Sequence, residues 1–251
     1  MILWTHILEE YALRGLGLPA MSGRDEVLLP KASWLRAPRA ADAIKEKQLI
    51  SGNYLVKYGG EYLRETLKTG RIRLGPAASY GDPSLNPAIR DDELEISLEL
   101  LPSETSMHLV DKSTGQKKNE IHPTGNVTAK YRSDTDYYVY CLSSVYDFRL
   151  YDDFTATCCL IITNPKEFIS RLIRRFVEQF PGWDGWGDSV VYIDPLNPSR
   201  RGVTVFFNKH FRFAYQKEYR VVFIHPSAKN LLDPIFLELG SLENFAELIV
   251  L

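Results

Sequence analysis

The sequence predicts an α+β fold, in which a mostly antiparallel β core is packed by a few helices. Short runs of β-branched and aromatic residues, which are typical of strands, outnumber the helical segments along the 251 residues. Most of these runs follow one another across turn-forming residues and do not alternate with helices. Hydrophobic residues make up 45% of the chain, which is enough for a packed core.

Composition limits the classes of function. The formal net charge of -2 does not indicate a chain dedicated to nucleic acid. The three cysteines, Cys141, Cys158 and Cys159, are odd in number and form no Cys-x-x-Cys pair. We therefore expect reduced thiols in a cytoplasmic protein and no structural zinc, with Cys158 and Cys159 buried and not bonded to each other. We find no signal peptide and no run of about 18 apolar residues, so we expect no membrane partner.

The first 53 residues are expected to form a helical arm on a main domain of residues 54–251. Apolar residues at helical spacing predict a helix over residues 2–14, ended by Gly15. A second helix is expected over residues 38–49, because proline is favoured in the first helical turn.

The main domain opens with a predicted strand at residues 54–58. A helix over residues 61–69 follows, and Gly70 stands where a C-cap glycine belongs. Residues 71–74 alternate like a strand, and residues 75–83 are a loop by their glycine and proline content.

An acidic run, Asp91-Asp92-Glu93, precedes a predicted strand over residues 94–101. Three adjacent carboxylates can hold a divalent cation. Such a run is more typical of a solvated lead-in to a strand, and we expect no metal. Residues 102–135 are polar and are predicted to form a β-rich excursion with a hairpin turn at residues 113–118.

Two strands and a long helix are expected next. The strands cover residues 137–142 and 154–162, and the second is apolar enough to be covered on both faces. The Asn-Pro-Lys-Glu sequence at residues 164–167 is typical of a helix start, and the helix is predicted to reach residue 180.

A glycine-rich loop over residues 182–187 carries Trp183 and Trp186. These rings can stack on a ligand or anchor the loop to the core, and we favour anchoring. Residues 190–193 and 203–207 are predicted strands joined by a turn, in the manner of a hairpin. The remaining expectations are a loop over residues 208–215, a strand around Glu218, and closing strands over residues 235–239 and 246–251.

The strand that ends at Ile224 carries the most informative polar residues. Period-two alternation places Gln216, Glu218 and Arg220 on one face, opposite Tyr219, Val221 and Phe223. Polar groups at the end of an apolar strand indicate a cleft. A salt bridge between Glu218 and a nearby arginine is an equally good interpretation.

Three short motifs resemble a family of uncharacterised bacterial and phage proteins. Those proteins share an Asn-Asp-Pro loop after a helix that ends in glycine, a Cys-Phe/Leu-Ser strand, and a late Glu-x-Glu-Tyr-Arg strand. The matching stretches are Tyr80-Gly81-Asp82-Pro83, Tyr140-Cys141-Leu142-Ser143-Ser144 and Gln216-Lys217-Glu218-Tyr219-Arg220, within residues 54–225. Gly81 and Gln216 replace the family's asparagine and glutamate.

The same positions distantly resemble ADP-ribosyltransferases. That resemblance implies a split β core that cradles NAD, which is the substrate. Lys57 stands in the place of a basic residue on the first strand, where arginine is expected. Ser143 and Ser144 stand in an incomplete serine motif, and Gln216 and Glu218 stand for the Gln/Glu-x-Glu pair.

The resemblance implies a coherent chemistry. Glu218 would hold the ribose hydroxyl and stabilise the oxocarbenium-like state of nicotinamide–ribose cleavage. Gln216 would orient the acceptor, a protein or a nucleic acid, and Lys57 would meet the pyrophosphate. Tyr58 or Tyr80 would stack on nicotinamide. Without an acceptor the site would hydrolyse NAD. We expect Glu218 to share one cleft with Lys57, Tyr80 and Ser143.

The biological role implied is that of a toxin or phage-defence effector. The alternative is a non-enzymatic interaction module of phage defence or counter-defence, supported by the N-terminal arm and the two tryptophans. A third interpretation, nucleic-acid binding, depends on five arginines, of which those on the long helix are more typical of a solvated face. They are Arg171, Arg174, Arg175, Arg200 and Arg201.

Overall fold

The computed structural model describes residues 46, 49, 53–194, 203–225, 227 and 232–250. The predicted helix over residues 2–14 lies outside the described residues. The helix predicted over residues 38–49 does so too, apart from two single positions, and the predicted division of the chain at residue 53 remains a prediction.

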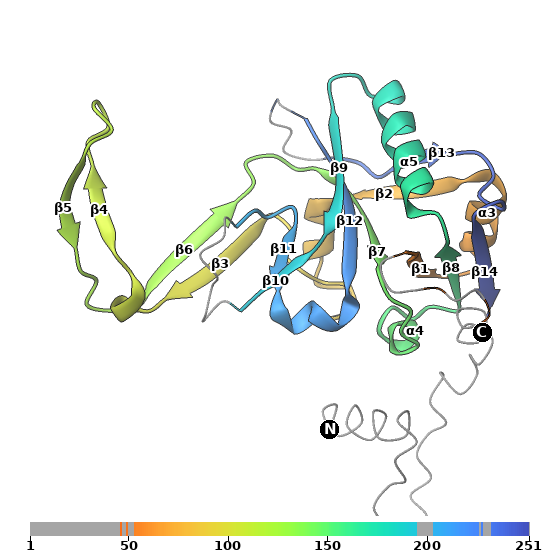
Figure 1. Cartoon of the computed structure of the whole chain (residues 1–251), viewed down its shortest axis with the longest axis horizontal. Helices are drawn as coiled ribbons and strands as arrows, with labels where there is room; N and C mark the ends of the chain where they lie inside the picture. The colour runs from red at the N-terminus through yellow and green to blue at the C-terminus, as the bar shows by residue number, and fades with distance from the viewer. Residues whose placement is uncertain are drawn as a thin grey trace, which may run out of the picture. The chain divides into compact units, whose positions relative to one another are not determined.

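Over the described ranges the protein is α+β with mostly antiparallel sheets and few helices, as predicted (Figure 1). The main sheet of the described residues has eight strands in the order β13-β2-β7-β1-β8-β14, with β12 paired to β7 and β9 paired to β12. Its strands are β1 (Leu55–Gly59), β2 (Arg71–Pro76), β7 (Tyr138–Ser143), β8 (Cys158–Ile162), β9 (Asp184–Ser189), β12 (Glu218–Ile224), β13 (Ile235–Glu238) and β14 (Ala246–Val250).

Three two-stranded sheets complete the described strands. Two of them are antiparallel, and the third is parallel. They are β3 (Glu95–Leu100) with β6 (Val127–Arg132), β4 (Met107–Val110) with β5 (Lys117–Ile121), and β10 (Val191–Ile193) with β11 (Asn208–His210). The helices are α3 (Tyr62–Thr69), α4 (Arg149–Asp153) and α5 (Pro165–Gln179), with 3-10 turns η2 (Ala77–Gly81), η3 (Pro102–Glu104) and η4 (Phe211–Gln216).

The main sheet divides at β7. One edge of β7 pairs with β12 from Ser143 to Tyr138. The other edge is shared, because β1 pairs with its Ser143 end and β2 pairs with its Tyr138 end. We call the gap between β1 and β2 along this edge the strand fork.

Helix α5 covers one face of the sheet, as the sequence predicts. The side chain of Asn164 accepts a hydrogen bond from the Glu167 N–H at 3.2 Å, which caps the helix. Phe168, Leu172 and Phe176 of α5 are fully buried, and the ring of Phe176 stacks 3.8 Å from that of Phe223 on β12. Trp183 is buried beside Phe176, so the predicted anchoring role is confirmed for Trp183, but it is wrong for Trp186, which is 48% exposed.

The opposite face of β1 and β8 packs against α4. Leu150 and Tyr151 of α4 lie against Tyr58 and Cys159, and the Tyr151 hydroxyl donates to Cys159 Sγ at 2.9 Å. Cys158 and Cys159 are buried free thiols, as predicted, because adjacent residues on a strand point to opposite faces of the sheet.

Two predictions about strands near the C-terminal half were wrong. Residues 182–187 are not a loop, because residues 184–189 form β9 at the edge of the main sheet. The two glycines within β9 are typical of a loop, so the sequence does not indicate a strand here. A side chain at Gly185 would overlap the Phe223 ring, and one at Gly187 would crowd Tyr219, so these glycines allow the close packing of the sheet.

The predicted hairpin of residues 190–193 and 203–207 was also wrong. The partner of β10 is β11, and the two strands are parallel. Residues 208–210 are polar, which hid the strand, while Phe206 and Phe207 pack on the core outside any strand. The apolar run over residues 154–162 likewise contains strand only from Cys158, because α4 and a turn at Thr155 precede it.

No helix within the described ranges is long and apolar enough to cross a membrane.

Candidate functional site

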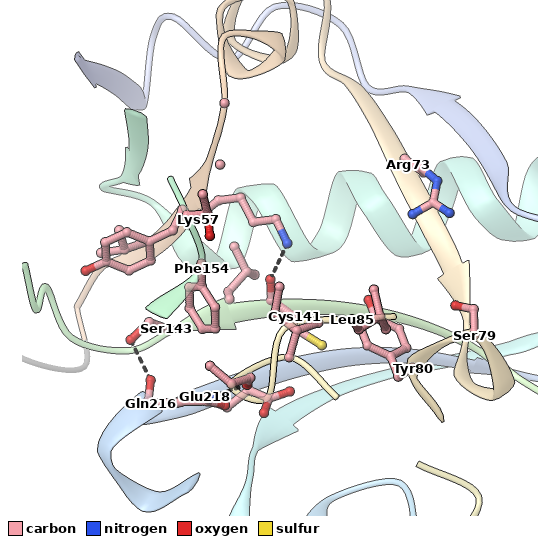
Figure 2. Close-up of a pocket in the computed structure, with 18 of the residues that line it drawn as sticks. Lys57, Arg73, Ser79, Tyr80, Leu85, Cys141, Ser143, Phe154, Gln216 and Glu218 are labelled. Carbon is pink, nitrogen blue, oxygen red and sulfur yellow. Dashed lines mark hydrogen bonds between the residues drawn. The ribbon is translucent and has the colours of Figure 1, made fainter. Parts of the chain in front are cut away.

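A cavity of about 600 Å³ opens in the strand fork (Figure 2). Strands β1 and β2 wall it on either side, and β7 and β12 lie beneath it. Residues 82–93, η2 and η4 add to the lining, and Tyr62 of α3, the turn at Phe154 and Thr155, and Lys209 of β11 complete it. The volume falls within the range typical of small-molecule sites.

Six of the seven residues predicted for the site line this cavity. They are Lys57, Tyr58, Tyr80, Ser143, Gln216 and Glu218. Ser144 is not among the lining residues, and its hydroxyl donates to the Lys217 carbonyl at 2.9 Å. The structure therefore brings Glu218 together with Lys57, Tyr80 and Ser143 in one cavity.

Glu218 belongs to a buried ion cluster of four residues, Glu93, Lys209, Glu218 and Arg220. Arg220 Nε donates to Glu218 Oε1 at 2.6 Å, and Lys209 Nζ donates to Oε2 at 3.1 Å. The guanidinium of Arg220 also binds both carboxylate oxygens of Glu93. Nη1 lies 2.7 Å from Oε2, and Nη2 donates to Oε1 at 2.8 Å. The salt-bridge interpretation of Glu218 is thus correct, and Glu218 also lines the cavity.

The cluster contains two carboxylates and two cations. Burial raises the pKa of Glu218, but attraction to Arg220 and Lys209 outweighs it and lowers this pKa to about 2. Burial lowers the pKa of Lys209, and here the attraction of Glu218 and Glu93 outweighs it and raises the pKa. Glu218 is consequently ionised at neutral pH although it is buried.

Lys57 and Arg73 lie on the facing strands of the fork (Figure 2). Lys57 Nζ donates to the Cys141 carbonyl at 2.8 Å and lies 4.5 Å from the centre of the Tyr140 ring. Burial is the largest influence on the pKa of Lys57 and lowers it, and repulsion from Arg73 adds to this effect. In the part of the chain that the structure describes, neither cation forms an ion pair with a carboxylate.

The tyrosines differ in how firmly they are held. The ring of Tyr58 makes an edge contact with Tyr151 at 5.1 Å, and its hydroxyl accepts from the Asp147 N–H at 2.7 Å. Tyr80 sits on η2, and its ring lies beside Gly75. Burial raises the pKa of Tyr80 well above its usual value, so this hydroxyl stays protonated. Tyr80 is the better placed of the two to stack on a ligand.

Ser143 and Gln216 join the surrounding elements. The Ser143 hydroxyl lies 2.8 Å from the carbonyls of both Val145 and Gln216. Gln216 Nε2 donates to the Ala88 carbonyl at 2.7 Å and so holds the segment Asp82–Glu93 against η4. Both side chains help to shape the cavity, whatever ligand it takes.

Three residues of the site were missed from the sequence. Glu93 was expected to be a solvated lead-in, which is wrong, because it is buried against Arg220. Lys209 was assigned to a loop, and Arg73 was noted only as part of an alternating strand. The acidic run at residues 91–93 and the alternation of residues 71–74 were visible, but only the fold shows which charges meet.

Among the residues that the structure describes, no group of three or more His, Cys, Asp or Glu residues could hold a metal ion. Cys141 lines the cavity, but burial raises its pKa, so its thiol is a poor nucleophile at neutral pH.

Comparison with protein-family models, curated proteins and solved structures gives no match.

Proposed function

We propose that this protein uses NAD as a substrate and cleaves the nicotinamide–ribose bond, either to transfer ADP-ribose or to hydrolyse NAD. One observation supports this most. A single cavity holds an ionised, buried carboxylate, Glu218, together with a tyrosine and two cations, Lys57 and Arg73, that pair with no carboxylate among the described residues. These groups match the charges and rings of a dinucleotide.

Glu218 has the charge that the reaction needs. Cleavage passes through an oxocarbenium-like state, which a nearby carboxylate stabilises. A carboxylate offers about four acceptor positions. Arg220 and Lys209 use two at Glu218, which leaves acceptor positions for a ribose hydroxyl.

The remaining roles follow from position. Tyr80 stacks on the nicotinamide ring, and Lys57 meets the pyrophosphate. The amide nitrogen of Gln216 donates a hydrogen bond to the Ala88 carbonyl, which leaves the amide oxygen to orient the acceptor. The resemblance to bacterial and phage proteins, together with the free thiols, supports a cytoplasmic toxin or phage-defence effector whose acceptor is a protein or a nucleic acid.

The test is release of nicotinamide from NAD, followed by chromatography and mass spectrometry of the products. Glu218→Gln should lower turnover on the order of 10²–10³-fold, because it removes the charge that stabilises the reacting ribose. This variant also breaks the shorter of the two ion pairs of Lys209 and leaves it only Glu93 at 3.5 Å, and breaking a buried ion pair costs about 3–5 kcal/mol. A stability control is therefore needed.

Glu93→Gln is the matched control. It removes a carboxylate from the same buried ion cluster, so that Arg220 loses one of its two negatively charged partners. Glu218 stays ionised in this variant. Assayed well below both melting temperatures, Glu93→Gln should retain most turnover when Glu218→Gln does not. Equal losses in the two variants, or no nicotinamide release by the wild type at millimolar NAD, would refute the proposal.

One observation favours the second candidate, a non-enzymatic interaction module. Strands β4 and β5, which we call the outer hairpin, expose every side chain, including several large apolar ones. These are Met107, Leu109, Val110 and Ile121. Exposed apolar residues on an isolated two-stranded hairpin are typical of a surface that binds a partner.

The third interpretation loses support. Arg171 pairs with Glu167 at 2.6 Å, and Arg175 pairs with Glu178 at 3.2 Å. These arginines serve the solvated face of α5, as expected. Arg200 and Arg201 lie outside the described residues.

A further inference from the structure

Arg73 is the cation of the cavity to which the proposed chemistry gives no task. It lies on β2 between Ile72 and Leu74, which are buried, while Arg73 itself faces outward into the strand fork. Lys57 reaches into the same gap from β1 (Figure 2). The gap exists because β1 leaves β7 after Ser143, and β2 joins it only at Val139. The position of both cations is thus fixed by the topology of the sheet.

The charges of the cavity are unevenly compensated. Glu93 and Glu218 are matched by Arg220 and Lys209. Asp82 is exposed, and one of its oxygens accepts from the Ser84 N–H at 2.8 Å. Lys57 has a carbonyl and a ring as close partners, and Glu218 attracts it only from farther away. An anion bound between Lys57 and Arg73 would relieve their mutual repulsion.

Lys57 and Arg73 differ in how their charged groups bind phosphate, and sites for phosphoanions use both kinds of group. A guanidinium binds phosphate oxygens through two parallel hydrogen bonds, whereas an ammonium acts as a point charge. Here they line one cavity from separate strands, and two linked phosphates offer each cation a phosphate group of its own. A single phosphate has to share its oxygens between the two cations, so we expect it to bind less tightly.

We infer that Lys57 and Arg73 form a binding site for a pyrophosphate group, which selects nucleotides containing a phosphoanhydride over monophosphates. Arg73 is the residue that makes this selection. The inference rests on the proposed function only for the identity of the ligand as NAD, because the site is built from groups outside the buried ion cluster.

The test is calorimetric titration with inorganic pyrophosphate, ADP-ribose and AMP. The wild type should bind pyrophosphate and ADP-ribose more tightly than AMP. Arg73→Gln should weaken pyrophosphate binding about 10- to 100-fold, as expected for loss of a charge-assisted pair. Arg73→Lys should fall between the two, because it keeps the charge and loses the planar fork.

Arg71→Gln is the matched control. Arg71 lies two residues away on the same strand and is also exposed, but it pairs with Glu65 at 3.2 Å and does not line the cavity. It should bind pyrophosphate as the wild type does. Equal weakening in Arg71→Gln and Arg73→Gln, or no binding of pyrophosphate by the folded wild type, would overturn the inference.

The outcome can be separated from that of the proposed function. Glu218 acts on Lys57 only from farther away, so Glu218→Gln, which removes a negative charge, should bind pyrophosphate at least as tightly as the wild type. Binding that depends on Arg73, without nicotinamide release, would refute only the enzymatic proposal. Nicotinamide release that is indifferent to Arg73, with no binding of pyrophosphate, would refute only this inference.

Discussion

Glu218 shows how a single side chain can be both a structural and a chemical element. Its carboxylate is held by Arg220 and Lys209, and it also lines the cavity. Burial alone would favour its neutral form. The two cations keep it ionised, and Glu93 in turn fixes the orientation of Arg220. Each charge in the buried ion cluster therefore depends on the others.

This coupling predicts a specific acid sensitivity. The pKa of Glu218 is lowered from 4.5 to about 2 in the folded protein. Between these values the unfolded chain binds a proton that the folded protein does not. The stabilisation is thus fully present above about pH 4.5 and is lost as pH falls toward about 2.

Chemical denaturation across this pH range measures the effect. Glu218→Gln should be less stable than the wild type at neutral pH, and its unfolding free energy should fall less steeply on acidification. Glu243→Gln, a change at an exposed position, should follow the wild-type curve. A wild type and a Glu218→Gln variant with parallel pH profiles would contradict the assignment.

Gly70 offers a second test at a single position. It ends α3 with φ +69°, and an added methyl group would overlap the Gly240 backbone. Gly240 has φ +77° but open space where a side chain would lie. Gly240→Ala should cost only the left-handed strain, about 1–2 kcal/mol, and Gly70→Ala should cost about 1–3 kcal/mol more from overlap. Thermal or chemical unfolding of the two variants measures the difference, and equal losses would show that the overlap relaxes.

At the scale of elements, the contribution of α5 to stability can be tested by changing one buried residue and one exposed residue of the helix. Leu172 is fully buried in its apolar face, so Leu172→Ala should cost about 2–5 kcal/mol. Arg174→Ala, at an exposed position on the same helix, should change the unfolding free energy by less than about 0.5 kcal/mol. A melting temperature unchanged by Leu172→Ala would mean that α5 does not hold the sheet.

Elements with strong local signals could be predicted from the sequence. Helix α5 has its cap at Asn164 and an apolar stripe, and α3 ends at Gly70 in the expected left-handed conformation. Strands β9 and β11 could not be predicted, because glycine and polar side chains dominate them. Pairing with β12 and β10 decides their structure, and such pairing is a property of the tertiary fold.

The candidate site follows the same division. Polar residues at strand ends correctly indicated Lys57, Ser143 and Glu218 as neighbours. The rest of the buried ion cluster could not be found in this way, because Glu93 and Lys209 come from segments without a periodic pattern. Glu93 is far from Glu218 in sequence, and Arg220 joins the two carboxylates by pairing with both.

At the scale of the whole molecule, removal of the outer hairpin can distinguish the enzyme from the interaction module. Between residues 101 and 126, no residue whose burial the structure describes is buried. Leu100 of β3 pairs directly with Val127 of β6. An Asn-Gly turn can therefore replace residues 101–126 and close the remaining hairpin in a favoured geometry.

This excision should leave the main sheet and the cavity unchanged, because the removed residues bury almost no apolar surface. We expect an unfolding free energy within about 1 kcal/mol of the wild type, since surface changes of this kind cost little.

If the protein is an NAD-cleaving enzyme, hydrolysis of NAD by the shortened chain should match that of the wild type. Transfer to a macromolecular acceptor can still fall, since the exposed apolar residues of the outer hairpin are then its docking surface. A shortened chain that is folded, binds pyrophosphate and has lost only its cellular effect would support the interaction module. Loss of the fold itself would show that the outer hairpin contributes to the core, contrary to its exposure.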